Sequence, residues 1–129
     1  MLDLHNFKLK SSPNQYFVAP PGFATAAAAH RPSPEFPWPA ADLARRFRAV
    51  AQAEPRVTLE EETAGGLRFD LVQRSALFRF PDTVSIEVIP LGDSRSTLAI
   101  YSRSTYGYSD LGVNHKRIER WLARLAETR

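Results

Sequence analysis

The chain has 129 residues, of which 43% are hydrophobic and 24% charged, a balance that suits one globular domain. It contains no cysteine, which excludes disulfides, thiolate nucleophiles and cysteine metal sites. No stretch approaches the ~20 apolar residues of a membrane span, and no signal peptide is recognisable. We therefore expect a cytoplasmic protein without a transmembrane segment.

The net charge of +3 comes from residues 100–129, which hold six basic and three acidic residues. This surplus is too small to predict nucleic-acid binding. Arginine outnumbers lysine fourteen to three. Because the arginine fork suits carboxylates and phosphates, an anionic partner is one interpretation. A GC-rich genome, which favours arginine codons, is the other.

Residues 1–38 are expected to form an irregular arm that wraps a domain made of residues 39–129. Seven of the ten prolines precede residue 40, and proline excludes long helices. Aromatic residues are interleaved with these prolines, unlike in a disordered tail. A short edge strand over Gln15–Ala19 fits the pattern. Four aromatic side chains are expected to be mostly buried: Phe17, Phe23, Phe36 and Trp38.

Two segments, Pro39–Ala53 and Val113–Glu127, carry one apolar stripe each at spacings of three and four residues, which predicts helices. The first begins with a proline, which suits a first helical turn, and Pro55 ends it. A second stripe of the C-terminal segment is basic and is expected to face solvent: Lys116, Arg120 and Arg124.

Alternation of apolar and polar residues predicts four strands between these helices. They are Arg56–Thr63, Leu67–Arg74, Thr83–Ile89 and Thr97–Ser104. Consecutive strands with short links usually pair antiparallel. The expected fold is therefore α+β: a four-stranded antiparallel meander sheet with both helices packed on one face, preceded by the proline-rich arm.

The stretch Ile100–Leu125 holds the most distinctive motifs of the chain. Ser102-Arg103-Ser104 is expected to end the last strand, and the glycine of Gly107-Tyr108 is expected to let the chain turn. The run "SDLGVN", Ser109–Asn114, then leads into the basic helix.

Two further motifs are "QRSALFRFPDTV", Gln73–Val84, and "SSPNQYFVAP", Ser11–Pro20. In all these motifs the chain resembles the bacterial and plastid family called domain of unknown function 1499. Many members of that family carry a cysteine directly after Ser-Pro-Asn, where this chain has Gln15. No role of that cysteine carries over, and the resemblance implies no activity because the family is uncharacterised.

The passage from the last strand into the last helix is the candidate binding site. Free amides at a helix N-terminus, together with nearby cations, suit an anion. Arg74 and Arg103 would converge on it if their strands align. The expected contact residues are Arg74, Arg103, Asp110, Asn114 and Arg117, with Tyr106 and Tyr108 at the rim.

Structural roles compete with a binding role for these residues. Asp110 or Asn114 is well placed to cap the helix with a side-chain oxygen. Arg103 is equally suited to pairing with Asp110 or Asp82 as an internal brace. The tyrosines are also suited to the rim of the core. The sequence leaves these alternatives open.

No catalytic, metal or cofactor motif is evident. His5, His30 and His115 are far apart and lack metal-ligand spacing. No Gly-x-Ser-x-Gly elbow or phosphate-binding glycine loop is present. We expect no metal site and no cofactor, and a binding module is favoured over an enzyme.

The leading hypothesis is a small non-catalytic module that binds an anionic or amphipathic small ligand, or a partner protein. One alternative is a hydrolase-type enzyme that uses Ser102 or Ser104 with Asp110. Another is a protein-interaction subunit whose proline-rich arm docks elsewhere.

Overall fold

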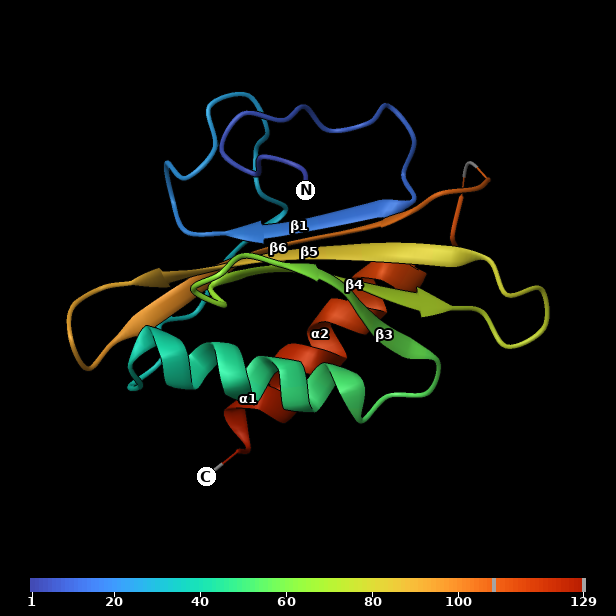
Figure 1. Ribbon diagram of the computed structural model, residues 1–129. Helices are drawn as coiled ribbons and strands as arrows, with labels where there is room; N and C mark the ends of the chain where they lie inside the picture. Colours follow the sequence, from blue (N-terminus) through green and yellow to red (C-terminus); the bar gives the residue numbers. More distant parts are fainter. Residues whose placement is uncertain (108, 129) are drawn as a thin grey trace.

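The computed structural model describes residues 1–107 and 109–128, which form six strands and two helices. Figure 1 shows both helices below the sheet and the N-terminal arm above it. The α+β class and the position of both helices on one face are therefore confirmed. The strands are β1 (Gln15–Ala19), β2 (Arg31–Pro32), β3 (Val57–Glu62), β4 (Arg68–Arg74), β5 (Pro81–Pro90) and β6 (Ser96–Ser104). The helices are α1 (Ala40–Gln52) and α2 (Val113–Ala126).

The sheet is six-stranded and mixed, in the order β2-β1-β6-β5-β4-β3. Its β3–β6 part is the expected antiparallel meander. The expectation of four strands, all antiparallel, is corrected by the arm: β1 pairs antiparallel with β6, and β2 pairs parallel with β1. The outer edge of β6 would otherwise expose unpaired N–H and C=O groups, and β1 satisfies them. The alternation of apolar and polar residues within one segment does not show that it pairs with a strand so distant in the sequence.

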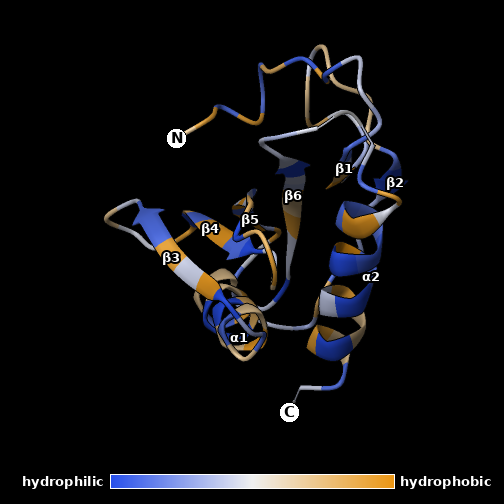
Figure 2. Ribbon diagram, turned by 90° about the vertical axis from the view of Figure 1, so that its right-hand side faces the viewer, coloured by the Kyte–Doolittle hydropathy of each residue, from blue (hydrophilic) through white to orange (hydrophobic). Residues whose placement is uncertain are grey.

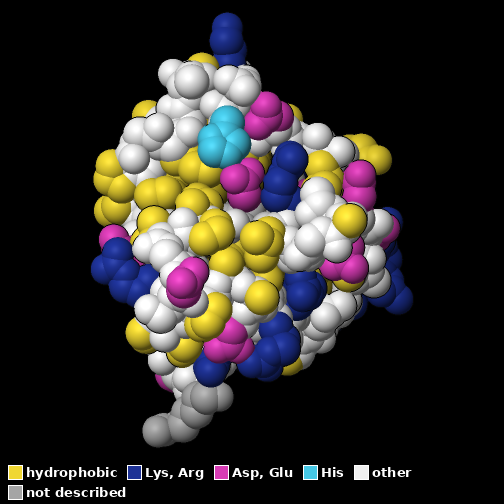
Figure 3. Space-filling model, turned by 60° about the vertical axis from the view of Figure 1, so that its left-hand side comes forward, with side chains coloured by type: hydrophobic (Ala, Val, Ile, Leu, Met, Phe, Trp, Pro, Cys, Tyr) yellow, Lys and Arg dark blue, Asp and Glu magenta, His cyan; other side chains and the backbone are white. Residues whose placement is uncertain are grey.

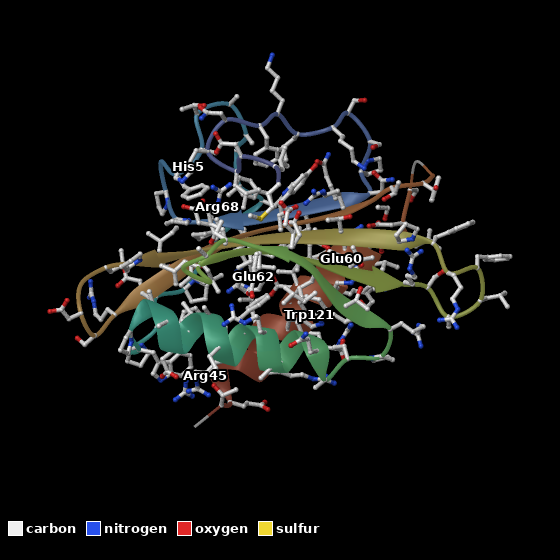
Figure 4. All side chains as sticks on the ribbon, in the orientation of Figure 1. His5, Arg45, Glu60, Glu62, Arg68 and Trp121 are labelled. Carbon is white, nitrogen blue, oxygen red and sulfur yellow. The ribbon has the colours of Figure 1, made fainter. Side chains whose placement is uncertain are left out.

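The main core lies between the sheet and the two helices. Trp121 of α2 is fully buried there, and its ring meets that of Phe47 of α1 at 5.9 Å between centroids. Figure 4 shows Trp121 between the helices and the sheet. The strands supply Phe69, Leu71 and Ile100 to the same cluster. The helical stripes read from the sequence therefore face the sheet, as expected.

The arm buries a second, smaller cluster on the opposite face of the sheet. Phe7 contacts Phe17 and Tyr101, with ring centroids 5.0 and 4.5 Å away. In Figure 2 the arm lies above the sheet, α1 lies below it and α2 runs down the right-hand side. Of the four aromatic residues expected to be mostly buried, Phe17 and Phe36 are buried, whereas Phe23 and Trp38 are half-buried.

Within residues 1–107 and 109–128, no helix has the length and apolar character needed to cross a membrane.

Candidate functional site

The candidate site lies at the end of the sheet where β4 and β6 end and where β5 and α2 begin. This end faces the viewer in Figure 2. The strand register places Gln73, Asp82 and Ser104 directly opposite one another on three neighbouring strands. Because side chains alternate along a strand, Ser102 shares this face, which is the face that α2 covers. Four polar side chains are thus gathered under the first turns of α2.

Asp110 caps the first turn of α2. Its Oδ1 accepts a hydrogen bond from the Gly112 amide at 2.8 Å, and its Oδ2 accepts one from the Asn114 amide at 3.1 Å. Burial alone would raise the pKa of Asp110, but these bonds and one from the Asn114 side chain lower it below the usual value. The capping role that competed with anion binding is therefore the one that Asp110 has.

Asn114 is fully buried and joins three parts of the fold. Its side-chain amide donates to Asp110, to Ser104 Oγ at 3.0 Å and to the carbonyl of Asn14 at 3.2 Å. Its Oδ1 accepts a hydrogen bond from Ser102 Oγ at 2.6 Å. Because unsatisfied buried polar groups are costly, this set of bonds fixes how α2 meets the ends of β1 and β6.

Arg117 is the second buried polar residue of α2, with 4% of its surface exposed. Nε donates to Gln73 Oε1 at 2.6 Å, and Nη2 donates to Asp82 Oδ2 at 2.7 Å. Nη1 donates to Asn114 Oδ1 at 2.8 Å. The guanidinium group is therefore held on three sides, and Asp82 neutralises its charge.

A hollow of about 300 Å³ opens beside this network, and its walls are strongly cationic. Asp82 is its one acidic lining residue, and Arg117 already pairs with it. Three further cations have exposed side chains and no ion pair within residues 1–107 and 109–128: Arg56, Arg74 and Lys116. We call this feature the cationic hollow. Its lining residues are Arg56, Gln73, Arg74, Ser75, Asp82, Val113, Lys116, Arg117 and Arg120.

Arg120 also lines the cationic hollow, but its charge is already engaged. Its guanidinium pairs with Glu54 at 2.6 Å, and Arg124 pairs with the same carboxylate at 2.6 Å. Burial alone would raise the pKa of Glu54, but hydrogen bonds from Trp121 and Arg120 lower it below the usual value. The positive surplus of the hollow therefore rests on Arg56, Arg74 and Lys116.

Main-chain geometry positions two of these cations. Arg56 Nε donates to the Arg74 carbonyl at 2.9 Å, and Arg74 Nη1 donates to the Arg79 carbonyl at 3.0 Å. Arg56 and Arg79 both have left-handed backbone conformations, with φ of 59° and 60°. This conformation is unfavourable for residues other than glycine. The turn before β3 and the β4–β5 loop thus hold the side chains of Arg56 and Arg74 beside the hollow.

Arg103 does not take part in this arrangement. It lies one position from Ser102 and Ser104 and so faces the arm, where Nη1 donates to Ser85 Oγ at 2.7 Å and to the Tyr101 carbonyl at 3.1 Å. Its guanidinium lies over the Tyr101 ring, and burial lowers its pKa. The expected convergence of Arg74 and Arg103 is not found, because Arg103 leans back along β6, away from the end of β4.

Tyr106 and Tyr108 were the two tyrosines expected at the rim of the site. Tyr106 is 61% exposed, and its ring lies 5.5 Å from that of Phe80 on the neighbouring loop. Tyr108 lies outside the described residues. The structure therefore brings Asp110, Asn114 and Arg117 together, places Arg74 in the adjacent hollow and leaves Tyr106 beyond its lining.

Ser102 and Ser104, the serines of the hydrolase alternative, are separated from Asp110 by Asn114. The Ser102 hydroxyl donates its hydrogen bond to Asn114 Oδ1, an amide oxygen that is not a base. Ser102 is fully buried. These contacts are those of a structural hydroxyl.

Arg117 was expected to contact an anion and its burial was not predicted, although the sequence carries a signal for that burial. Asn114, Arg117, Trp121 and Leu125 follow one another at spacings of three and four residues. The polar pair therefore continues the apolar stripe of α2 toward its N-terminus. Arg56 gave no comparable signal, because its place beside the hollow depends on where the strands end.

The face shown in Figure 3 is turned away from this end, and basic and acidic side chains lie next to each other over much of it. On the face drawn in Figure 3, positive and negative side chains are thus mixed, unlike in the cationic hollow. A comparison with curated proteins found no match. The family described as "Protein of unknown function (DUF1499)" matches residues 11–125, a range that includes the whole cationic hollow. The chain therefore belongs to the DUF1499 family of uncharacterised proteins.

Proposed function

We propose that the chain is a non-catalytic module that binds a small amphipathic anion in the cationic hollow. The observation that carries this proposal is a surplus of three exposed cations, Arg56, Arg74 and Lys116, which have no ion pair among the described residues. They surround a hollow whose acidic lining residue, Asp82, is already neutralised by Arg117. Arginine and lysine in such a setting favour phosphate and carboxylate groups.

The floor of the hollow supports binding because it is rigid before any ligand arrives. Arg117, Gln73 and Asp82 are fixed by mutual hydrogen bonds of 2.6 and 2.7 Å. Because these side chains are already ordered, binding a ligand costs less conformational entropy. Arg56 and Arg74 are also held by main-chain carbonyls, so the ligand needs to order few further side chains.

An apolar part of the ligand has a place next to the anionic group. Val113 lines the hollow and is 45% exposed. The aliphatic stems of Arg74 and Lys116 add further apolar surface, since long basic side chains cover apolar groups well. These features favour an anion with a short hydrocarbon tail over a bare inorganic ion.

Calorimetric titration with octyl phosphate, inorganic phosphate and octanol tests the proposal. We expect octyl phosphate to bind most tightly and octanol not to bind. The double variant Arg74→Gln/Lys116→Gln should weaken octyl phosphate binding at least about tenfold, because each charge-assisted bond contributes about 1.5 kcal/mol or more. Arg45→Gln, which removes a charge from the exposed face of α1, is the matched control. Equal losses in both variants would refute the site.

The hydrolase alternative receives no support from the contacts of Ser102 and Ser104, so it is not carried further. A cytoplasmic location stays a prediction, which fractionation of cells that produce the chain would test.

A further inference from the structure

Large apolar side chains are exposed on the two loops beside the cationic hollow. The β4–β5 loop exposes Leu77 by 80%, Phe78 by 67% and Phe80 by 51%. The β6–α2 connection exposes Tyr106 by 61% and Leu111 by 86%. We call these five side chains the loop tips. Clusters of this kind on a surface usually mark a site of interaction.

Three of the loop tips, Phe78, Phe80 and Tyr106, form one continuous aromatic surface. The Phe78 and Phe80 rings stack at 5.5 Å, and the Phe80 ring lies 5.5 Å from that of Tyr106. The amide of Thr105 donates to the carbonyl of Pro81 at 3.3 Å, which joins the bases of the two loops. Both loops project from the same end of the sheet, on the right in Figure 1 and toward the viewer in Figure 2.

Unpaired positive charge flanks the loop tips. Arg74, Arg79 and Lys116 are exposed, and none has an ion pair in the part of the chain that the structure describes. The acidic groups at this end are already engaged: Asp82 pairs with Arg117, and Asp110 caps α2. An anionic partner would thus meet no opposing free carboxylate from these two residues.

The backbone holds some of these side chains outward at an energetic cost. Arg79 and Leu111 have φ of 60° and 55°, and both side chains are exposed. For Leu111, the left-handed backbone conformation and the exposure of the apolar side chain to water each cost free energy. Strained residues of this kind cluster at functional sites, including those that clamp ligands.

We propose that the loop tips dock on the surface of an anionic lipid bilayer. Leu77, Phe78 and Leu111 enter the boundary between headgroups and acyl chains, while the flanking cations contact lipid phosphates. Apolar tips flanked by arginine and lysine match this interface in both polarity and charge. Tyr106, with an apolar ring and a polar hydroxyl, suits the headgroup level. The proposal goes beyond the proposed function, because it needs loop side chains that do not line the cationic hollow.

Co-sedimentation with vesicles tests the docking. We expect the full chain to bind vesicles of phosphatidylcholine mixed with phosphatidylglycerol, and not vesicles of phosphatidylcholine alone, with binding that weakens as salt is added. Leu77→Ser/Phe78→Ser should reduce binding at least about tenfold. Leu91→Ser is the matched control, because Leu91 is an exposed leucine in the β5–β6 turn at the other end of the sheet. No binding to the anionic vesicles, or an equal loss in the control, would overturn the proposal.

Insertion has a direct optical test in the Phe78→Trp variant. Its fluorescence should shift to shorter wavelength on anionic vesicles, whereas that of Leu91→Trp should shift only as much as that of the unmodified chain, which contains Trp38 and Trp121. An unshifted Phe78→Trp spectrum with vesicles bound would overturn insertion of the loop.

The two proposals fail independently. Leu77→Ser/Phe78→Ser should keep the affinity of the unmodified chain for octyl phosphate, because neither residue lines the cationic hollow. Vesicle binding without octyl phosphate binding would refute the proposed function alone. Octyl phosphate binding without vesicle binding would refute the docking alone and assign the loop tips to another partner, such as an acidic protein.

Discussion

Arg117 carries a charge into the interior of the protein, and its surroundings explain how that charge is tolerated. Its guanidinium donates to Gln73, Asp82 and Asn114, all within 2.8 Å. A buried ion pair of this kind is weak evidence for stability, because desolvation opposes the attraction. Breaking one by removal of a single partner is different, since the other charge is left buried and unpaired.

Arg117→Met should therefore destabilise the fold by about 3 kcal/mol in urea unfolding. Methionine fills similar space but leaves Asp82, whose side chain is 15% exposed, without its cation. Adding Asp82→Asn should restore part of the loss, so that the two substitutions are non-additive by more than about 1 kcal/mol. Arg45→Met on the exposed face of α1 should change stability by about 0.5 kcal/mol or less. Strict additivity would show that the pair does not stabilise the site.

Arg117 also shows the limit of reading single residues from the sequence. Arginine is usually exposed, and Arg117 was expected to contact an anion at the start of the last helix, so its burial was not predicted. The helical spacing that it shares with Trp121 pointed inward, but its partners Gln73 and Asp82 lie on strands far away in the sequence. Burial of a charge becomes predictable only once its partners are known.

At the scale of elements, local pattern predicted each helix and each meander strand to within about two residues. Strand pairing outside the meander was harder. β1 pairs with β6, more than eighty residues away, and β2 pairs parallel with β1 over two residues. The alternation of apolar and polar residues within a strand does not show which strand it pairs with or in which direction. Both depend on which edge of the sheet remains open.

The first residues of the arm are attached to the sheet by an ion pair that responds to pH. His5 Nε2 lies 2.9 Å from Glu87 Oε2 of β5, and Arg68 of β4 lies 3.6 Å from the same carboxylate. Figure 4 shows His5 and Arg68 close together above the sheet. The hydrogen bond to Glu87 raises the pKa of His5 above its ordinary 6.5, against the effect of burial.

Because the pKa of His5 is higher in the folded state, this contact should stabilise the fold fully below pH 6.5 and progressively less as the pH rises through the raised value. His5→Gln should therefore lower the free energy of unfolding at about pH 5.5 and have less effect at about pH 8.5. In a Glu87→Gln background the same substitution should lose its pH dependence. An equal effect of His5→Gln at both pH values would contradict this account.

At the scale of the whole molecule, the arm completes the sheet on one side and covers one of its faces. β1 covers the edge of β6, while Leu4, Phe7 and Phe17 cover Ala99 and Tyr101. We propose that the arm wraps a domain of residues 39–129 that depends on it. This dependence distinguishes a structural arm from a tail that is only tethered.

Two truncations separate these possibilities. Deleting residues 1–8 removes Leu4 and Phe7, which are 2% and 6% exposed, and should cost about 3–5 kcal/mol while the sheet remains intact. The melting temperature should fall, and the uncovered ring of Tyr101 should increase binding of a hydrophobic dye. Deleting residues 1–38 also removes β1 and leaves the long β6 strand as an open edge, so that this fragment should aggregate when produced alone. A fragment of residues 39–129 that stays monomeric and melts like the full chain would show that the arm is a tether, because only then would neither the edge of β6 nor the face beneath the arm need its cover.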